Sequence, residues 1–350
     1  MANSSEGRPS KALVVGVVSF YIIAALAMIV ANKWVLNETA APLFLLFTQL
    51  VIGALLMWVG DQLRLFPDRL TLDVQTAKGM APLIALNVVG LSFSNFTLKY
   101  VDASFYQVAR GLVLPFTVAT SYFMLHTRPS ARILSACAIV TAGFMIGVLL
   151  DAIPVSLRGI FFGVVSSLIS AIATVVIKQA LPIVNGSSIV LAWYGNLLSA
   201  IVLFPILLLA GEGPAIFAML HGDPPPDAPE GTPSELRTFA WGALITGIFG
   251  FAMSVAAPLS IKVTSPISHI ISAAVRGVAS SFLGLWLFHD SISGGRATSI
   301  AVVLGGSIFY TWIKNQEAEA AKSANGNNKY ESVAMFEVDE DELEEGKQSV

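Results

Sequence analysis

The chain is poor in charge and in the residues that cross-link chains or hold metals. Only 12% of its 350 residues are Asp, Glu, Lys or Arg, while 55% are hydrophobic and the mean hydropathy is +0.73. Its one cysteine, Cys137, lies in an apolar segment, and it has only 4 histidines. These shortages exclude a disulfide framework, and we expect neither a metal site nor a cofactor. The composition also differs from that of a soluble globular domain, so we expect a membrane protein that crosses the bilayer several times.

Apolar stretches of about 20 residues, long enough to cross a bilayer as a helix, recur along the whole chain. The sequence predicts an all-α membrane protein with ten transmembrane helices, at residues 12–36, 41–59, 79–98, 103–125, 132–150, 157–177, 188–210, 238–261, 265–288 and 294–313. An even number of spans places both termini on one side. That side carries ten Lys and Arg in and beside its loops, against five on the other, so the positive-inside rule predicts cytosolic termini.

The predicted spans divide the chain into four parts. Residues 1–11 form a cytosolic N-terminus, residues 12–150 and 151–314 form two five-helix repeats, and residues 315–350 form a cytosolic tail. The tail carries 3 basic against 10 acidic residues and few apolar ones, so we expect it to be disordered. Within the second repeat we expect a proline-rich acidic lumenal loop, residues 211–237, to be extended.

The two halves carry similar residues at a constant spacing. Adding 163 to the residue number relates Lys99 to Lys262, His126 to His289, and Gly143 to Gly306. Five spans is an odd number, so the second copy must enter the membrane in the opposite orientation. Inverted repeats of this kind are typical of secondary transporters, whose binding site lies near the bilayer midplane between the halves. The alternative is that such residues recur by chance in a helical membrane protein.

Two arginines interrupt the apolar helices at corresponding places of the two halves. Arg110 lies in the fourth predicted span and Arg276 in the ninth, and no predicted span contains Asp or Glu. An arginine stays protonated, and its charge is costly inside a membrane without a counter-ion. We therefore expect an anionic substrate, and a phosphate or diphosphate suits the bidentate guanidinium. The alternative is that these side chains reach a backbone carbonyl or a lipid phosphate.

Several segments together resemble a known family. They are Asn32-Lys33, residues 98–112 (LKYVDASFYQVARGL), residues 177–188 (IKQALPIVNGSS), residues 249–277, and Tyr310-Thr311-Trp312. As a set they resemble the nucleotide-sugar and triose-phosphate transporter family of the drug/metabolite transporter superfamily, and most of all its carriers of GDP-fucose. The resemblance covers roughly residues 13–314.

The resemblance implies a ten-helix antiporter of the Golgi membrane, with the endoplasmic reticulum as the alternative. Such a carrier exchanges a cytosolic nucleotide sugar, here GDP-fucose, for a lumenal nucleoside monophosphate, here GMP. GDP-mannose, a UDP-sugar or a triose phosphate are the alternatives within the family. A membrane-embedded enzyme is a further alternative, but the spans offer no carboxylate and no pair of histidines to serve one. We expect no nucleic acid polymer as a partner, and the sequence leaves a homodimer open.

The resemblance also implies roles for four of the eight candidate site residues. The family's basic residues in the FYxxxR/K segment and in the ninth helix bind the phosphates, which implies this role for Arg110 and Arg276, although lysine is usual in the ninth helix. GDP-sugar carriers read guanine with an FYNN segment in helix seven, where this chain has Trp193-Tyr194-Gly195-Asn196. We expect Tyr194 to stack on the base and Asn196 to bond its edge.

The other four candidates lie beside the two arginines in the sequence. Ser265 and His269 are at the start of the ninth span, where His269 is expected to bond a phosphate or ribose, or else a neighbouring carbonyl. Tyr106 and Gln107 precede Arg110 by about one helical turn and are expected to contact the sugar or the base. The family's GALNK segment for GDP-mannose reads SAAVR here, and the second basic residue of triose-phosphate carriers falls on Gly277.

Overall fold

The structure is a computed structural model, and it describes most of the chain. It covers residues 11–39, 41–126, 128–151, 155–221, 234–263, 266–288 and 293–345, with the backbone alone at 11–14, 125, 178, 188, 255–263, 266–274, 318 and 321–345. The described residues fold into α-helices and one short 3₁₀ turn, η1 (Leu181–Val184), with no strand among them. An all-α fold is therefore confirmed for this part of the chain.

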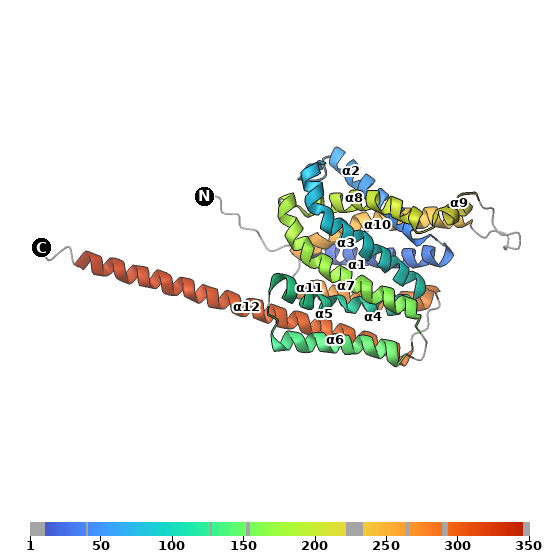
Figure 1. The fold of residues 1–350 in the computed structure, drawn as a ribbon. Helices are drawn as coiled ribbons and strands as arrows, with labels where there is room; N and C mark the ends of the chain where they lie inside the picture. Colours follow the sequence, from blue (N-terminus) through green and yellow to red (C-terminus); the bar gives the residue numbers. More distant parts are fainter. Residues whose placement is uncertain are drawn as a thin grey trace.

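The helices lie side by side in one bundle (Figure 1). In chain order they are α1 (Lys11–Glu38), α2 (Pro42–Gln62), α3 (Val74–Tyr100), α4 (Ala103–Gly111), α5 (Val113–Leu125), α6 (Ala131–Leu149), α7 (Leu157–Ala180), α8 (Ser188–Leu209), α9 (Gly213–His221), α10 (Glu235–Val263), α11 (Pro266–Phe288) and α12 (Gly294–Glu345). Within the described residues, eight of them are long and apolar enough to cross a membrane: α1, α2, α3, α6, α7, α8, α10 and α12.

The predicted fourth span is broken into two helices, α4 and α5. They meet at Leu112, whose N–H donates to the carbonyl of Ala109 at 3.1 Å, a tighter turn than that of an α-helix. Pro115, three residues on, has no N–H to donate, and its ring would clash with the carbonyl of Gly111. The proline therefore accounts for the break, which lies directly after Arg110.

Two segments that the sequence predicted to be irregular contain helix among their described residues. The loop at residues 211–237 contains α9, because GPAIFAMLH is apolar enough to pack against the bundle, where Met219 is 3% exposed. The rest of that loop, residues 222–233, lies outside the described residues. The acidic tail, expected to be disordered, continues α12 as far as Glu345. Residues 317–322 near the start of the tail, EAEAAK, have high helix propensity. Figure 1 shows α12 running past the end of the bundle.

Glycines bring α6 and α12 into close contact. A Cβ on Gly143 of α6 would lie 2.8 Å from Cγ2 of Val303, and a Cβ on Gly306 of α12 would lie 2.7 Å from Cγ2 of Val140. These contacts are closer than real Cβ atoms make, so only glycine allows the two backbones to approach this far. Besides this pair, the most extensive packing joins α3 with α7 and α1 with α10.

Charged side chains at one end of the bundle are buried and bonded. Arg296, at the start of α12, is 1% exposed and is ion-paired with Asp151 and, at 3.4 Å, with Asp102. Lys33 donates to the carbonyls of Leu98 and Val101 at 3.0 and 2.7 Å. These bonds hold together the ends of α1, α3, α4 and α12.

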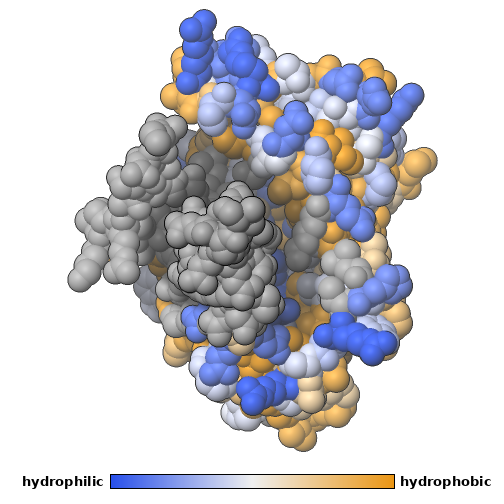
Figure 2. All heavy atoms as spheres, turned by 90° about the vertical axis from the view of Figure 1, so that its left-hand side faces the viewer, coloured by the Kyte–Doolittle hydropathy of each residue, from blue (hydrophilic) through white to orange (hydrophobic). Residues whose placement is uncertain are grey.

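The opposite end is the one past which α12 extends. Figure 2 shows this end face, where hydrophilic side chains gather over the surface and hydrophobic ones appear toward its margins. Asp61 is buried here and accepts a hydrogen bond from the N–H of Leu70 at 3.1 Å. Ser187, before α8, donates to Asp68 at 2.6 Å and so ties two loops together. A bundle with polar ends and apolar flanks is the arrangement that suits a bilayer.

Candidate functional site

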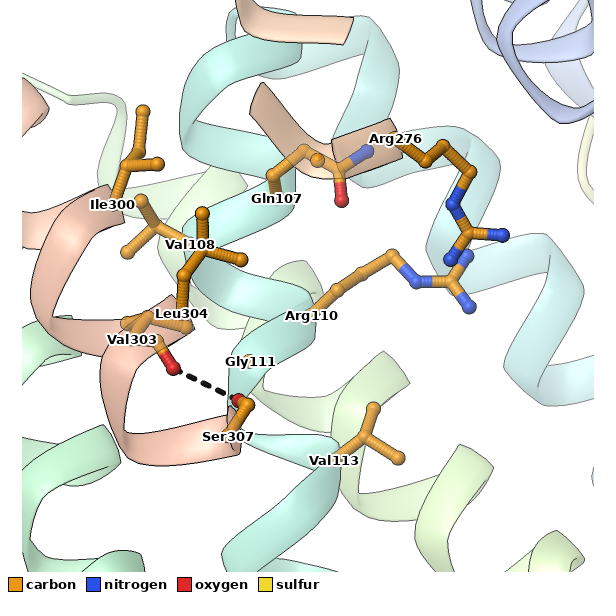
Figure 3. Close-up of a pocket in the computed structure, with 11 residues that line it drawn as sticks. Gln107, Val108, Arg110, Gly111, Val113, Arg276, Ile300, Val303, Leu304 and Ser307 are labelled. Carbon is orange, nitrogen blue, oxygen red and sulfur yellow. Dashed lines mark hydrogen bonds between the residues drawn. The ribbon is translucent and has the colours of Figure 1, made fainter. Parts of the chain in front are cut away.

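The two predicted arginines line one cavity. Arg110 projects from the last turn of α4 and Arg276 from the middle of α11, and Figure 3 shows their guanidinium groups ending next to each other. The cavity has a volume of about 220 Å³. Its lining is Gln107, Val108, Arg110, Gly111, Val113, Arg276, Gly277, Ile300, Val303, Leu304 and Ser307. The structure therefore brings together residues that are 166 positions apart in the chain.

Each guanidinium is held by a tyrosine hydroxyl. Arg110 donates from Nη1 to Oη of Tyr106 at 3.0 Å, and Arg276 donates from Nη1 to Oη of Tyr21 at 2.9 Å. The same tyrosine rings lie beneath the cations, with Cζ to ring-centre distances of 5.6 and 5.5 Å. Such contacts orient a cation and partly offset its desolvation, but they do not cancel its charge.

No carboxylate of the described residues neutralises either arginine. The ion pairs in this part of the chain involve Arg69 and Arg296. The Nε of Arg276 is in addition buried and has no hydrogen-bond partner. Because a buried donor without a partner costs about 1 to 3 kcal/mol, and more when charged, an anion in the cavity would be strongly favoured. Both arginines thus line a cavity and have no acidic partner among the described residues, and their binding of an anion stays a prediction.

A second, smaller chamber adjoins Arg110 on the side of α3 and α7. It has a volume of about 90 Å³ and shares Arg110 and Val113 with the first cavity. The rest of its lining is Leu86, Asn87, Gly90, Leu91, Ser94, Ser166, Ser167, Ser170 and Ala173. Arg110 therefore stands between two cavities, one with Arg276 and one with a carboxamide and four serines.

The two candidate residues that precede Arg110 on α4, Tyr106 and Gln107, differ in whether they line a cavity. Gln107 lines the larger cavity, as the prediction of a ligand contact requires. Tyr106 is 7% exposed, and its hydroxyl bonds both Arg110 and, at 2.8 Å, Ser94. Tyr106 lies outside the lining of either cavity, so in this structure it positions the arginine instead of contacting a ligand itself.

The predicted base-reading pair on α8 lies elsewhere. Tyr194 is 1% exposed in the core between α2, α3 and α8, and its hydroxyl accepts a hydrogen bond from the N–H of Asp73 at 2.8 Å. Asn196 faces α2, where its Nδ2 donates to Sδ of Met57 at 3.6 Å. Neither is among the residues that line the two cavities of Arg110 described above, so the expected stacking and base contact stay predictions. Both residues belong to the packing of α8 against its neighbours.

The remaining candidates fall outside what the structure describes. Ser265 is not described, and for His269 only the helical backbone of α11 is. Their expected phosphate or ribose contacts stay predictions. In the described part of the chain no group of three or more His, Cys, Asp and Glu lies together to hold a metal ion.

Three residues of the site were missed by sequence analysis: Tyr21, Asn87 and Ser94. Tyr21 comes from α1, and its only sequence signal is a polar-tipped aromatic in an apolar span. Asn87 and Ser94 lie on α3 and differ by seven positions, which places them on one helix face. That spacing could have identified them as a polar stripe within a predicted span.

Fold and site together define the class of protein. The chain is a helical membrane protein whose bundle encloses a cationic cavity, which is the architecture of a carrier for anions. The chain belongs to the Triose-phosphate Transporter family, whose model matches residues 12–311.

Curated relatives are similar over most of their length. The chain is 29% identical to "GDP-fucose transporter 1" of Mus musculus, over 91% of this chain and 88% of that protein. It is 30% identical to "GDP-fucose transporter, Golgi" of Drosophila melanogaster, over 86% and 90%. It is 31% identical to "GDP-fucose transporter 1" of Monosiga brevicollis, also over 86% and 90%. These relatives are transporters, as the family is.

Proposed function

We propose that this protein is a Golgi antiporter that carries GDP-fucose from the cytosol into the lumen in exchange for GMP. The observation that carries the proposal is the pair of adjacent guanidinium groups, Arg110 and Arg276, without a carboxylate partner among the described residues. The names of the three relatives supply the base and the sugar.

The charges of the two ligands suit the pair of arginines. The diphosphate of a nucleotide sugar carries about two negative charges, and a phosphate monoester such as GMP carries about 1.5 to 2 at neutral pH. Two fixed positive charges therefore balance either ligand, and each guanidinium can grip phosphate oxygens through two parallel hydrogen bonds. An exchange of one ligand for the other moves little net charge, so it needs no intramembrane carboxylate to couple it to protons or sodium.

An inverted repeat of ten spans is supported by the helix packing. The repeat would relate α1 to α7, α2 to α8, α3 to α10, α4 and α5 to α11, and α6 to α12. Under this relation the packing of α3 on α7 becomes that of α10 on α1, and the packing of α5 on α7 becomes that of α11 on α1. The pairs α6 with α12, α2 with α8, and α4 with α11 each map onto themselves, and all of these contacts exist.

Individual residues support the same relation. Gly143 contacts Val303, and Gly306 contacts Val140. The spacing of 163 converts the first pair into the second, since it relates Gly143 to Gly306 and Val140 to Val303. The two arginines lie on α4 and α11, the helices that the repeat exchanges. The site then lies on the pseudo-twofold axis, where a rocking of the halves exposes it to either side in turn.

The direction of transport follows from the charges at the helix ends. Cytosolic termini put ten Lys and Arg on the side from which α12 emerges, against five on the other. The buried cluster of Arg296, Asp102 and Asp151 then lies at the lumenal end. A nucleotide sugar made in the cytosol enters from the side of the termini, and the monophosphate returns from the lumen.

An exchange assay in liposomes tests the proposal. Purified protein in liposomes preloaded with GMP should take up radiolabelled GDP-fucose, and empty liposomes should take up little. Arg110→Ala and Arg276→Ala should each abolish uptake, because they remove a phosphate-binding charge. Arg132→Ala, which removes an exposed arginine at the start of α6, is the matched control and should leave uptake unchanged.

Two results would refute the proposal. Normal uptake by either cavity variant, with the same amount of protein in the membrane, would place the phosphates elsewhere. A covalent product from GDP-fucose in the wild-type assay would favour the enzyme alternative.

A further inference from the structure

The smaller chamber beside Arg110 contains a carboxamide that has no hydrogen-bond partner in the described part of the chain. Asn87 of α3 is partly buried and lines this chamber, and its side chain makes no hydrogen bond with any described residue. Other asparagines of the bundle differ: Asn95 donates to the carbonyl of Pro42 at 3.3 Å, and Asn32 accepts from Gln49 at 2.7 Å. Polar groups inside a membrane bundle are nearly always satisfied, so an unsatisfied carboxamide that faces a cavity calls for an explanation.

A glycine on α8 leaves this carboxamide accessible. A Cβ on Gly195 would lie 3.6 Å from Nδ2 of Asn87, in ordinary van der Waals contact. Any longer side chain at position 195 would therefore extend toward the amide and compete with a ligand for its hydrogen bonds. Gly195 thus leaves the Asn87 carboxamide accessible because it has no side chain.

The chamber suits a flat ring with a polar edge. Its walls include the apolar side chains of Leu86, Leu91, Val113 and Ala173, and its polar groups include Asn87 and Ser170. The Nδ2 of a carboxamide can donate to O6 of guanine while its Oδ1 accepts from N1–H, so one asparagine side chain can pair with this edge through two hydrogen bonds. The hydroxyl of Ser170 makes no hydrogen bond with the described residues either, and it supplies a further donor or acceptor.

We propose that Asn87, assisted by Ser170, reads the base of the nucleotide in this chamber. The proposal rests on the proposed function and deepens it. Arg110 lines both cavities, so a phosphate bound to it would stand between a base in the chamber of Asn87 and a sugar in the cavity of Gln107 and Arg276. Both exchanged ligands carry the base, and a base bound beside Arg110 explains how one site accepts both.

Nucleotide binding by single-residue variants tests the assignment. The ligand-induced rise in melting temperature of full-length protein is measured with GMP, UMP, CMP and AMP. For the wild type we expect GMP to bind most tightly. Asn87→Ala should weaken GMP binding by about tenfold and UMP binding by less than twofold, because lost hydrogen bonds to the edge affect only the matching base. Without ligand the Asn87→Ala protein should melt as the wild type does, since the Asn87 side chain makes no hydrogen bond with the described residues.

Asn196→Ala is the comparison variant, because Asn196 bonds Met57 outside the chamber. It should keep the preference for GMP.

Several results would overturn the assignment. One is a preference for GMP that survives in Asn87→Ala or is lost in Asn196→Ala. Another is a variant that loses GDP-fucose while it binds GMP and GDP normally, which would make Asn87 a sugar contact. A loss of stability together with equal weakening of all four nucleotides would make its role structural. A wild type without any base preference would refute it too.

The exchange assay distinguishes a failure of the proposed function from a failure of the base-reading assignment. A wild type that binds GMP selectively but exchanges no GDP-fucose would refute the substrate and leave the base-reading role of Asn87 standing.

Discussion

At the scale of residues, the site consists of cations that the protein orients without neutralising. Arg110 and Arg276 each bond a tyrosine hydroxyl and not a carboxylate of the described residues. A carboxylate in either place would compete with the substrate for the guanidinium. Tyrosine therefore fixes the direction of each side chain and leaves its charge available to a phosphate.

Removal of one hydroxyl tests this positioning role. Tyr106→Phe keeps the ring beneath Arg110 but deletes its bonds to Arg110 and Ser94. Since a hydrogen bond to a charged group contributes about 1.5 to 3 kcal/mol, we expect the KM for GDP-fucose to rise by roughly tenfold or more. Tyr122→Phe, on an exposed tyrosine of α5, should change nothing in the same uptake assay. Equal KM values for wild type and Tyr106→Phe would contradict the role.

At the scale of elements, close helix contacts depend on glycines in α6 and α12. Gly306 is buried against Val140, whereas a Cβ on its neighbour Gly305 would meet nothing within 4 Å. We expect Gly306→Ala to destabilise the protein by about 1 to 3 kcal/mol through overpacking. Gly305→Ala should be neutral or stabilise it by about 0.5 to 1 kcal/mol, because alanine is the better helix former. Melting temperatures in detergent distinguish the two, and similar values for both variants would show that the helices can separate freely.

The buried cluster at the start of α12 is a second element-scale feature. The side chains of Arg296 and Asp151 are each 1% exposed, so Arg296→Met removes the cation that balances a buried carboxylate, to which Ser293 still donates. The expected loss is about 3 to 5 kcal/mol, and the double variant Arg296→Met with Asp151→Leu should regain most of it. Arg69→Met is the control, because the Arg69 side chain is 64% exposed in its pair with Asp61, and such a pair contributes about 1 kcal/mol or less. A double variant no more stable than the single one would argue against the ion pair.

At the scale of the whole molecule, Glu212 links the two predicted halves. Its carboxylate accepts hydrogen bonds from the N–H groups of Leu43 and Phe44 at 2.9 and 2.8 Å, which caps α2 from the second half. Burial raises the pKa of Glu212 above its ordinary value of 4.5, and its bonds to these N–H groups offset the rise only in part. The folded state therefore binds a proton more readily than the unfolded state.

This pKa gives a signed prediction for stability. Between 4.5 and the raised pKa the folded protein holds more protons than the unfolded chain, so the contribution of Glu212 to stability falls as the pH rises through that window. Glu212→Gln keeps an acceptor oxygen and has no proton to lose. The difference in melting temperature, wild type minus variant, should therefore fall across the window. A difference that rises with pH would show that the pKa of Glu212 is lowered instead.

The cationic site was predictable because charges are conspicuous in apolar helices. Arg110 and Arg276 stand out in spans without acids, and their positions in the two halves differ from the spacing of 163 by three residues, which is close to one helical turn. Uncharged site residues carry no such signal. Tyr21 and Asn87 resemble the many other polar residues of the spans. A motif match suggested Tyr194 and Asn196 as base contacts, and in this structure their side chains bond Asp73 and Met57.

The sequence by itself determined that the chain is a helical membrane protein and that two arginines lie in apolar helices without acids. These follow from hydropathy and charge, which are properties of local segments. Only the tertiary structure decided which side chains surround the arginines, because Tyr21, Asn87 and Arg276 come from helices far apart in the chain. A hydrogen bond of 2.9 Å between such residues depends on the relative rotation of packed helices, which no local segment specifies.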